Sequence, residues 1–578
     1  MPASTMILRS DPGIKRDGTK FDGNFYTDGQ WVRFQRGLPR KIGGYVSLSK
    51  YLSEISRGFT TYTEQDLVYC HSGSANYLSS FNLDAYGNAS IIYDRTPTTL
   101  AKSSSNMWMF DYQYHASDNG LYIIAHVSPN GNSIQNATGG QIFYGDATST
   151  APLTEITSTP TGFNCTGGIV VLHPYMFYYG SDGIIGWSKA GDPNALNTGD
   201  AGIARPWGTK IIKGLPLRAG SGSAPAGLFW AYDAVIRCTF TGGSTLFQFD
   251  VIATDTSIMN ENSVVDYDGV FYWVGVDRFL MFNGVVREIP NQMNLNYFFD
   301  GLNKEQRTKV FCFKVTRYGE IWWAYPRGDA TECTHAVIYN VRENTWYDTA
   351  LPNGGRSAGA FNNYFAAPLL TGVTLHNPEF IITGTTTNGS PIITGLSSTS
   401  GLYAGMIVSS LTVPNIPILS VDSTSQITLQ TGVGVFAATY PLQFYTGFRV
   451  WRHEQGVDEV DGQSAIPIQS YFETADLSNI AQGGKNEYLS ITAIEPDFIQ
   501  SGPMSVQVTG RANARAPEVY SSSITFPETA SQPFEQIVML KEQRRELRVR
   551  FESNSLYGDY QMGQIIGHID SGDGTMIA

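Results

Sequence analysis

The sequence predicts a mainly β protein with a β-propeller core, an inserted small β domain and a C-terminal β-sandwich-like domain. Only 15% of the 578 residues are charged and 13% are aromatic, whereas about 25% of the residues of an ordinary soluble domain are charged. This composition argues against a disordered chain and against a helical protein, whose exposed faces are rich in Glu, Lys and Arg. Short apolar runs separated by Gly, Asn, Asp and Ser cover most of the chain, which is typical of strands and turns.

Residues 1–50 are expected to form an extended basic N-terminal arm. Lysines and arginines are frequent between residues 11 and 49, among glycines and aromatic residues, and the segment has little periodicity. Such an arm can be solvated, or it can become ordered against a partner whose carboxylates pair with its arginines. The composition leaves both interpretations open.

The propeller is predicted to comprise residues 51–370 and 445–470. An example of its pattern is the apolar run 270–275, which is followed by a second run at 278–286 that contains Asn283-Gly284, a strong hairpin signal. Many short antiparallel strands fit a sandwich, a barrel or a propeller. A single core stops growing near about 250–300 residues, whereas a propeller adds blades of about 40–50 residues, so six or seven blades fit. A brief helix is predicted near 302–309.

Two further β domains are predicted. Residues 371–446 contain only two charged side chains, Glu379 and Asp422, and are rich in Thr, Ser, Gly, Ile and Val. The flanking runs 361–365 and 448–453 resemble two strands of one hairpin, so this domain is predicted to be an insertion at a loop tip.

In the C-terminal domain, residues 471–578, several runs alternate apolar and polar residues, as strands with one buried face do.

Charge and cysteine usage narrow the class of protein. The net charge of −13 argues against a protein that binds nucleic acid with its whole surface. Five cysteines are scattered singly and are predicted to be buried free thiols of a protein made in a reducing cytoplasm. No run approaches the 18–20 apolar residues of a membrane helix, so stable membrane insertion is not expected. The apolar run Met6-Ile7-Leu8 near the N-terminus is too short for the core of a signal peptide, so no export signal is expected.

No catalytic residue, metal site or cofactor is predicted, and we expect a protein that is not an enzyme. The eight histidines lack metal-ligand spacing. Asp266, Asp268 and Asp277 flank aromatic strands and could be imagined as the carboxylate pair of a glycan hydrolase. Aspartates at strand ends, however, favour turns through their own hydrogen bonds to the backbone.

A carbohydrate-binding role is also considered, because sugar rings stack on aromatic faces. The tryptophans that raise it lie inside predicted strands, where packing between blades is the simpler explanation. They are Trp273, Trp322, Trp323 and Trp346.

The segment 18–45 carries the most distinctive motif. It contains Trp31-Val32-Arg33-Phe34, followed by Gly37, Pro39 and Lys41 and closed by Gly43-Gly44. This opening resembles the start of tail nozzle (tail tubular or tail stabilisation) proteins of short-tailed bacteriophages. The segments 186–193, 339–347 and 560–564 are similar to the same group.

The resemblance implies a virion tail protein that forms a ring of six copies on a β-propeller. The ring would extend the channel of the portal and adaptor proteins, contact tail fibres or spikes and a tail plug or needle, and conduct double-stranded DNA during ejection without reading its sequence. Arg33, Arg36, Arg40 and Lys41 are then candidates for docking on an acidic adaptor ring. The residues that line the channel do not follow from the sequence. A receptor- or carbohydrate-binding propeller of the tail and, less favoured, a glycan hydrolase are the alternatives.

Overall fold

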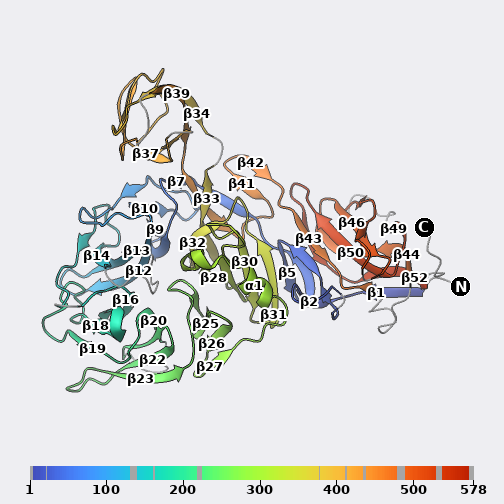
Figure 1. The fold of residues 1–578 in the computed structure, drawn as a ribbon, viewed down its shortest axis with the longest axis horizontal. Coiled ribbons are helices and arrows are strands. Elements are labelled where there is room, and N and C mark those ends of the chain that lie inside the picture. Colours follow the sequence, from blue (N-terminus) through green and yellow to red (C-terminus); the bar gives the residue numbers. More distant parts are fainter. Residues whose placement is uncertain are drawn as a thin grey trace.

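The computed structural model describes residues 4–20, 22–129, 139–160, 163–217, 224–375, 378–410, 413–433, 438–477, 488–513, 515–528 and 537–571. Nearly all regular structure in these ranges is β, which confirms the predicted fold class. Figure 1 shows a wheel of sheets, a small β domain above it, and a sandwich-like domain on the right that holds both termini.

The wheel is a β-propeller. Within the described residues, seven blades, each a four-stranded antiparallel arrangement, follow one another along the chain. The first strand of the first blade contacts the first strands of both the second and the seventh blade, so the ring is closed. The first three blades are β8 (Gly58–Glu64), β9 (Leu67–Gly73), β10 (Leu78–Leu83) and β11 (Tyr93–Asp94); β12 (Asn106–His115), β13 (Gly120–Pro129), β14 (Gln141–Asp146) and β15 (Thr154–Glu155); and β16 (Gly168–Leu172), β17 (Tyr175–Tyr179), β18 (Ile185–Trp187) and β19 (Gly202–Ala204).

The next three blades repeat this pattern, and aromatic side chains pack between them. Trp230 and Trp273, from neighbouring blades, meet edge to face with ring centroids 5.7 Å apart, a favourable aromatic geometry. These blades are β20 (Ile211–Pro216), β21 (Ala226–Ala231), β22 (Ala234–Phe240) and β23 (Phe247–Thr254); β24 (Val264–Tyr267), β25 (Val270–Val274), β26 (Phe279–Phe282) and β27 (Val286–Glu288); and β28 (Phe311–Val315), β29 (Glu320–Tyr325), β30 (His335–Asn340) and β31 (Thr345–Ala350).

The seventh blade joins strands from distant parts of the chain. Its order is β32 (Arg356–Asn362), β33 (Ala367–Leu375), β40 (Phe448–His453) and β7 (Tyr45–Leu52), so an N-terminal strand closes the ring. A hairpin of β41 (Glu459–Asp461) and β42 (Ser464–Ile466) extends the sheet beyond β7. Three short helical segments are present among the described residues: η1 (Ser181–Gly183), α1 (Leu295–Gly301) and η2 (Lys304–Lys309). The last of them falls in the predicted helical stretch.

The inserted domain is a small barrel between β33 and β40. Its strands are β34 (Phe380–Thr386), β35 (Ile392–Ile393), β36 (Ile407–Ser409), β37 (Ile416–Ser423), β38 (Gln426–Leu429) and β39 (Ala438–Tyr445). Two backbone hydrogen bonds between Thr385 and Thr394, of 2.7 and 3.0 Å, join the first and last strands of the six-stranded sheet. The barrel therefore encloses an apolar core of its own, which includes Ile418, Ile427 and Phe444.

The sandwich-like domain is built from both ends of the chain. Strands from the segment 1–50 pair directly with C-terminal strands; Asp28 lies opposite Glu473, for example, and Arg40 opposite Gln561. The N-terminal strands are β1 (Ser4–Leu8), β2 (Asp11–Ile14), β3 (Phe25–Tyr26), β4 (Asp28–Gln30), β5 (Val32–Gln35) and β6 (Leu38–Lys41). The C-terminal strands are β43 (Ser470–Glu473), β44 (Leu489–Glu495), β45 (Phe498–Ser501), β46 (Met504–Arg511), β47 (Val519–Tyr520), β48 (Ile524–Phe526), β49 (Val538–Arg544), β50 (Glu546–Ser553), β51 (Asp559–Met562) and β52 (Ile565–Ser571).

The described residues of the segment 1–50 are therefore built into the sandwich-like domain and the propeller, and they do not form a separate extended arm. The physical reason is that β1, β4 and β6 supply strands that complete C-terminal sheets, while β7 completes the propeller. None of the helices among the described residues is long and apolar enough to span a bilayer.

Candidate functional site

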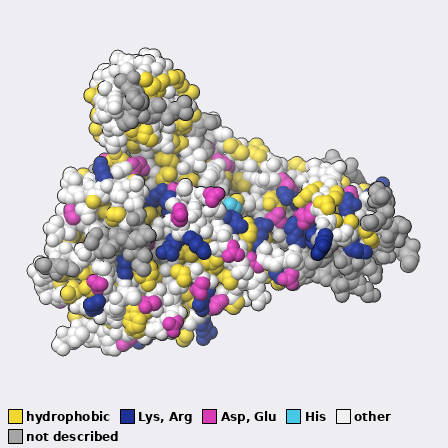
Figure 2. Space-filling view, in the orientation of Figure 1, with side chains coloured by type: hydrophobic (Ala, Val, Ile, Leu, Met, Phe, Trp, Pro, Cys, Tyr) yellow, Lys and Arg dark blue, Asp and Glu magenta, His cyan; other side chains and the backbone are white. Residues whose placement is uncertain are grey.

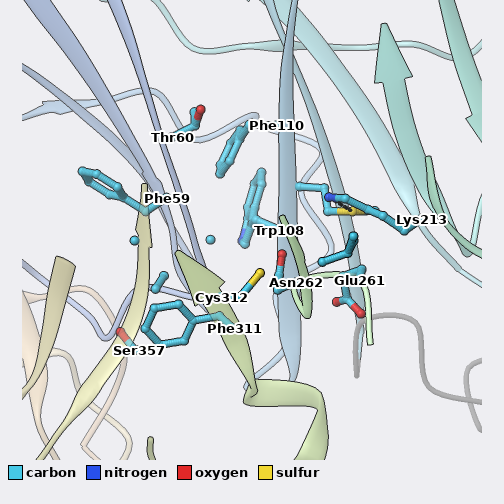
Figure 3. Close-up of a pocket in the computed structure, with 15 residues that line it drawn as sticks. Phe59, Thr60, Trp108, Phe110, Lys213, Glu261, Asn262, Phe311, Cys312 and Ser357 are labelled. Carbon is cyan, nitrogen blue, oxygen red and sulfur yellow. Dashed lines mark hydrogen bonds between the residues drawn. The ribbon is translucent and has the colours of Figure 1, made fainter. Parts of the chain in front are cut away.

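The axis of the propeller holds a small cavity lined by the first strands of several blades (Figure 3). Its volume is about 150 Å³, which is room for a few water molecules at about 30 Å³ each. In Figure 3 the rings of Trp108 and Phe110 stand on one side of this space, and Phe59 and Phe311 lie across it. The polar side chains that line it are Thr60, Lys213, Glu261, Asn262, Cys312 and Ser357.

Aromatic side chains narrow the space along the propeller axis. Trp108 is 1% exposed, and its indole N–H donates to the Ser74 carbonyl oxygen at 2.7 Å. A Cβ atom at Gly73 would lie 2.2 Å from Cγ of Trp108, so only glycine lets the indole approach this closely. The cavity can hold solvent or an ion-sized ligand, but it cannot pass a macromolecule.

The charges at the axis face one another. Lys213 is placed to interact with Glu261 and Asp111; burial lowers the pKa of its ammonium, and the two carboxylates oppose that change. Burial raises the pKa of Asp111, while N–H groups of Val171 and Tyr112 donate to its carboxylate at 2.7 and 2.8 Å and lower it. The hydrogen bond from Val171 to Asp111 joins the third blade to the second, its neighbour in the ring.

The Cys312 thiol beside this cavity is not activated as a nucleophile. Burial raises its pKa above the ordinary thiol value, so the thiol stays protonated, whereas a reactive cysteine needs the thiolate. Among the described residues, no group of three or more His, Cys, Asp or Glu side chains could hold a metal ion.

The carboxylates considered for a glycan hydrolase serve turns and a local ion pair. Asp266 accepts a hydrogen bond of 2.9 Å from the Gly269 N–H, and Asp268 adopts the left-handed conformation (φ 52°) in the same β24–β25 turn. Asp277 pairs with the adjacent Arg278 at 2.9 Å. The tryptophans considered for sugar binding are buried, with exposed fractions of 0–3% for Trp273, Trp322, Trp323 and Trp346.

The four basic residues considered for adaptor docking lie in very different surroundings. Arg33 is 1% exposed; its guanidinium donates to Glu320 at 3.0 Å and to Glu454 at 2.8 Å and lies 3.7 Å from the centre of the Tyr318 ring. These partners belong to the propeller, so Arg33 joins the N-terminal strands to the propeller within one chain.

Lys41 is also buried inside the chain. Its ammonium donates to the Gly558 carbonyl oxygen at 2.6 Å, and burial lowers its pKa to about 8. A partner could reach the Arg33 or Lys41 side chain only if the surrounding strands separated.

Arg36 and Arg40 are more accessible. Arg36 is exposed in the β5–β6 turn with φ 56°, and its backbone N–H donates to Glu343 at 3.0 Å. Arg40 is partly buried and donates to Gln35 at 2.8 Å. Only Arg36, of the four, presents an exposed side chain. Sequence reasoning missed the buried partners Glu320 and Glu454, because nothing in their spacing links them to Arg33.

No family model matches this chain, and no curated protein does. Among solved structures, a chain from a nidogen/laminin complex matches with 10% sequence identity and a TM-score of 0.29, covering 51% of this chain and 97% of that one. A chain of the computationally designed Ika8 protein matches with 10% identity and a TM-score of 0.30, covering 57% of this chain and 96% of that one.

Proposed function

We propose that this protein is a structural component of a bacteriophage tail, a ring-forming nozzle that extends the portal and adaptor channel and conducts genomic DNA during ejection. The observation that carries the proposal is the motif in residues 18–45, which resembles the opening of tail nozzle proteins. The proposal places the protein in the virion tail and gives it no enzymatic activity.

The contacts of this motif support a structural role. Trp31 is 1% exposed, and its indole N–H donates to the Gly43 carbonyl oxygen at 3.2 Å. A Cβ atom at Gly44 would lie 2.3 Å from the Asp458 carbonyl oxygen, so glycine permits a close approach of two backbone segments. The motif thus connects the N-terminal strands to the start of β7 and brings the chain there against the segment that leads into β41. These contacts give its residues a structural role.

The packing of the propeller axis constrains where DNA could pass. Because the axial cavity measures only about 150 Å³ and is lined by large aromatic rings, a duplex cannot thread a single propeller. A conduit therefore needs a space between several copies, as a closed cyclic ring provides. The net charge of −13 suits such a wall, because a cationic wall would hold the phosphates and release their counterions.

Assembly with the upstream tail components tests the proposal. Six copies of a 63.4 kDa chain give about 380 kDa. Native mass spectrometry of the chain mixed with its portal and adaptor proteins should therefore show a complex about 380 kDa heavier than the portal and adaptor complex alone. An image of the virion should place the chain as a ring below the adaptor. Density for single copies at the tips of fibres would overturn the nozzle and favour a receptor-binding protein.

Arg36 offers a docking test within the same assembly. Since its side chain is exposed at a turn, Arg36→Glu should weaken attachment of the ring to the adaptor and leave folding intact. Arg287→Glu, at another exposed arginine on the propeller, is the matched control. Unchanged attachment of R36E would remove Arg36 from the docking surface without affecting the proposed ring.

A further inference from the structure

A cleft of about 500 Å³ separates the inserted barrel from the first blade. In Figure 1 the barrel strand β37 lies above β7 and β10, and residues of all three strands, or next to them, line the cleft. Clefts between domains are common ligand sites when apolar and aromatic walls carry a few polar groups.

The cleft has walls of this kind. Three tyrosines, Tyr51, Tyr77 and Tyr403, line it, and Tyr403 is 48% exposed. Two aliphatic side chains in its walls are unusually exposed, Ile91 at 68% and Leu419 at 56%. Hydroxyl, amide and carboxylate groups come from Ser53, Ser79, Asp94, Gln430 and Thr446.

The charge of the lining does not favour polyanions as occupants. None of the described residues that line the cleft is Lys or Arg, and Asp94 is the one carboxylate among them. Burial raises the pKa of Tyr51, Tyr77 and Tyr403, so their hydroxyls stay neutral and can donate hydrogen bonds near pH 7. Two cations lie close to the lining: Lys102 is 5.1 Å from the centre of the Tyr77 ring, and Arg449, which pairs with Asp461 at 2.7 Å, is 4.9 Å from the centre of the Tyr51 ring. A polyanion needs a row of unpaired cations, which the described lining does not supply.

The backbone of the walls does not favour an extended peptide. β7, β10 and β37 each have hydrogen-bonded neighbours on both sides, so a peptide could not add itself as a strand to any of them. β11 (Tyr93–Asp94), which carries Asp94 of the lining, is the edge strand of the first blade, but its two residues offer little backbone for a peptide strand. Recognition in this cleft therefore relies mainly on side chains.

Gln430 supplies an acceptor that lacks a partner. Its side-chain oxygen is buried in the cleft wall and accepts no hydrogen bond within the described part of the chain. Such an atom carries a desolvation cost that a donor would remove. A rotation of the amide toward the cleft would let a ligand hydroxyl supply that donor.

We propose that the cleft between the inserted barrel and the first blade binds a neutral oligosaccharide. Flat tyrosine faces and aliphatic side chains match the C–H faces of sugar rings, while the hydroxyl and amide groups and the Asp94 carboxylate can hydrogen-bond to their hydroxyls. This site differs from the buried tryptophans considered above, and it does not depend on the proposed tail function.

The test is an array of neutral and anionic glycans probed with the full-length protein, followed by titration calorimetry with the neutral glycan that binds best. Tyr403→Ala should weaken this glycan at least about tenfold, as loss of an aromatic anchor does. Because Tyr403 is half exposed, its replacement should not disturb folding, which circular dichroism can confirm.

Tyr86→Ala is the control, since Tyr86 is 85% exposed on the first blade and does not line the cleft. Gln430→Leu, which removes the unpartnered acceptor, should also weaken the glycan. The proposal is overturned if no neutral glycan binds, if only anionic glycans bind, or if Y403A binds as tightly as Y86A. It is also overturned if Y403A changes the oligomeric mass of the protein, because a second copy would then fill the cleft.

Discussion

Arg33 is a buried cation whose charge is met by carboxylates from the propeller. It and Glu320 are 1% and 0% exposed, and Glu454 and the Tyr318 ring complete its surroundings. Removing one partner of a buried ion pair leaves the other charge uncompensated in a medium that solvates it poorly, at a cost of about 3–5 kcal/mol. Each of these buried charges destabilises the folded state unless its partner is also present.

We therefore expect Arg33→Met to lower the thermal midpoint of the protein markedly by scanning calorimetry, since the N-terminal strands lose their attachment to the propeller. The double variant R33M/E320Q should recover part of the loss, because the side chain at position 320 is then neutral and no longer needs a buried cation. Equal midpoints for the wild type and R33M would show that this pair contributes nothing to the junction.

His453 is buried in the seventh blade as a neutral imidazole. It is 6% exposed, and Nε of Arg356 donates to its Nε2 atom at 3.1 Å, so that atom carries no proton. Burial, with the nearby Arg356 charge, holds the pKa of His453 well below its ordinary value. Burial likewise lowers the pKa of His71 to about 3 and that of His126 to about 4.

These histidines predict that acid destabilises the propeller. Below about pH 6.5 the unfolded chain binds protons that the folded imidazoles cannot accept, so the free energy of unfolding falls by up to about 1.4 kcal/mol per pH unit for each such histidine. Thermal midpoints measured from pH 7.5 to pH 5 should fall, and His453→Gln should make the fall less steep. His173→Gln, at an exposed position, should leave the slope unchanged; equal slopes for H453Q and the wild type would contradict the assignment.

At the scale of elements, the inserted barrel is joined to the propeller as an extension of one hairpin. Leu375 at the end of β33 lies opposite Phe448 at the start of β40, so the chain leaves and re-enters the blade at the same point. The barrel has its own core, although Ile407 also packs against the apolar cluster that contains Leu52 and Phe448.

Replacing residues 376–447 with Asn-Gly should therefore leave the propeller folded, because a two-residue turn suits an antiparallel hairpin. We expect near-wild-type β content by circular dichroism and a modest fall in thermal midpoint, caused by exposure of the patch that Ile407 covers. Replacing residues 338–345 with Asn-Gly, which cuts into β30 and β31, is the contrasting control and should prevent folding. An unfolded 376–447 variant would mean that the barrel is needed to build the blade.

Elements with partners close in sequence could be predicted, and those with distant partners could not. The runs 270–275 and 278–286 correspond to β25 and β26–β27, which pair as neighbours along the chain. β4 and β6, by contrast, pair with strands near the C-terminus, and the local sequence does not predict a partner so far along the chain. Helix α1 depends on tertiary packing as well, since Phe298 contacts Tyr325 with ring centroids 4.5 Å apart.

The candidate site shows the same division. The tryptophans predicted to pack in the core are buried, because apolar runs reveal burial directly. Arg33 and Lys41 carry charge, which normally indicates an exposed side chain, and their burial depends on Glu320, Glu454 and the Gly558 carbonyl far along the chain. The cleft at Tyr403 is formed by two domains that meet only in the folded molecule.

At the scale of the whole molecule, basic side chains are scattered among acidic ones on the visible face (Figure 2). Several cations are neutralised within the chain, as when Arg57 pairs with Glu332 at 2.6 Å and Arg548 with Glu473 at 2.7 Å. Cations held in such pairs are poorly available to phosphates, and the net charge of −13 adds a repulsive background. Screening confines that repulsion to about 8 Å at physiological salt, so it acts on DNA that passes close to the wall.

The proposed conduit therefore predicts that the assembled protein does not retain duplex DNA at physiological salt. Proteins that bind DNA without sequence preference do so with Kd of about 10⁻⁴–10⁻⁶ M, and their affinity falls steeply as salt rises. A gel-shift titration with a linear duplex, to about 100 μM protein so that the whole of this range is covered, should show no shift. Saturable binding that weakens steeply with salt would reveal a cationic wall, which would slow the passage of a polyanion and is incompatible with a surface across which DNA must slide.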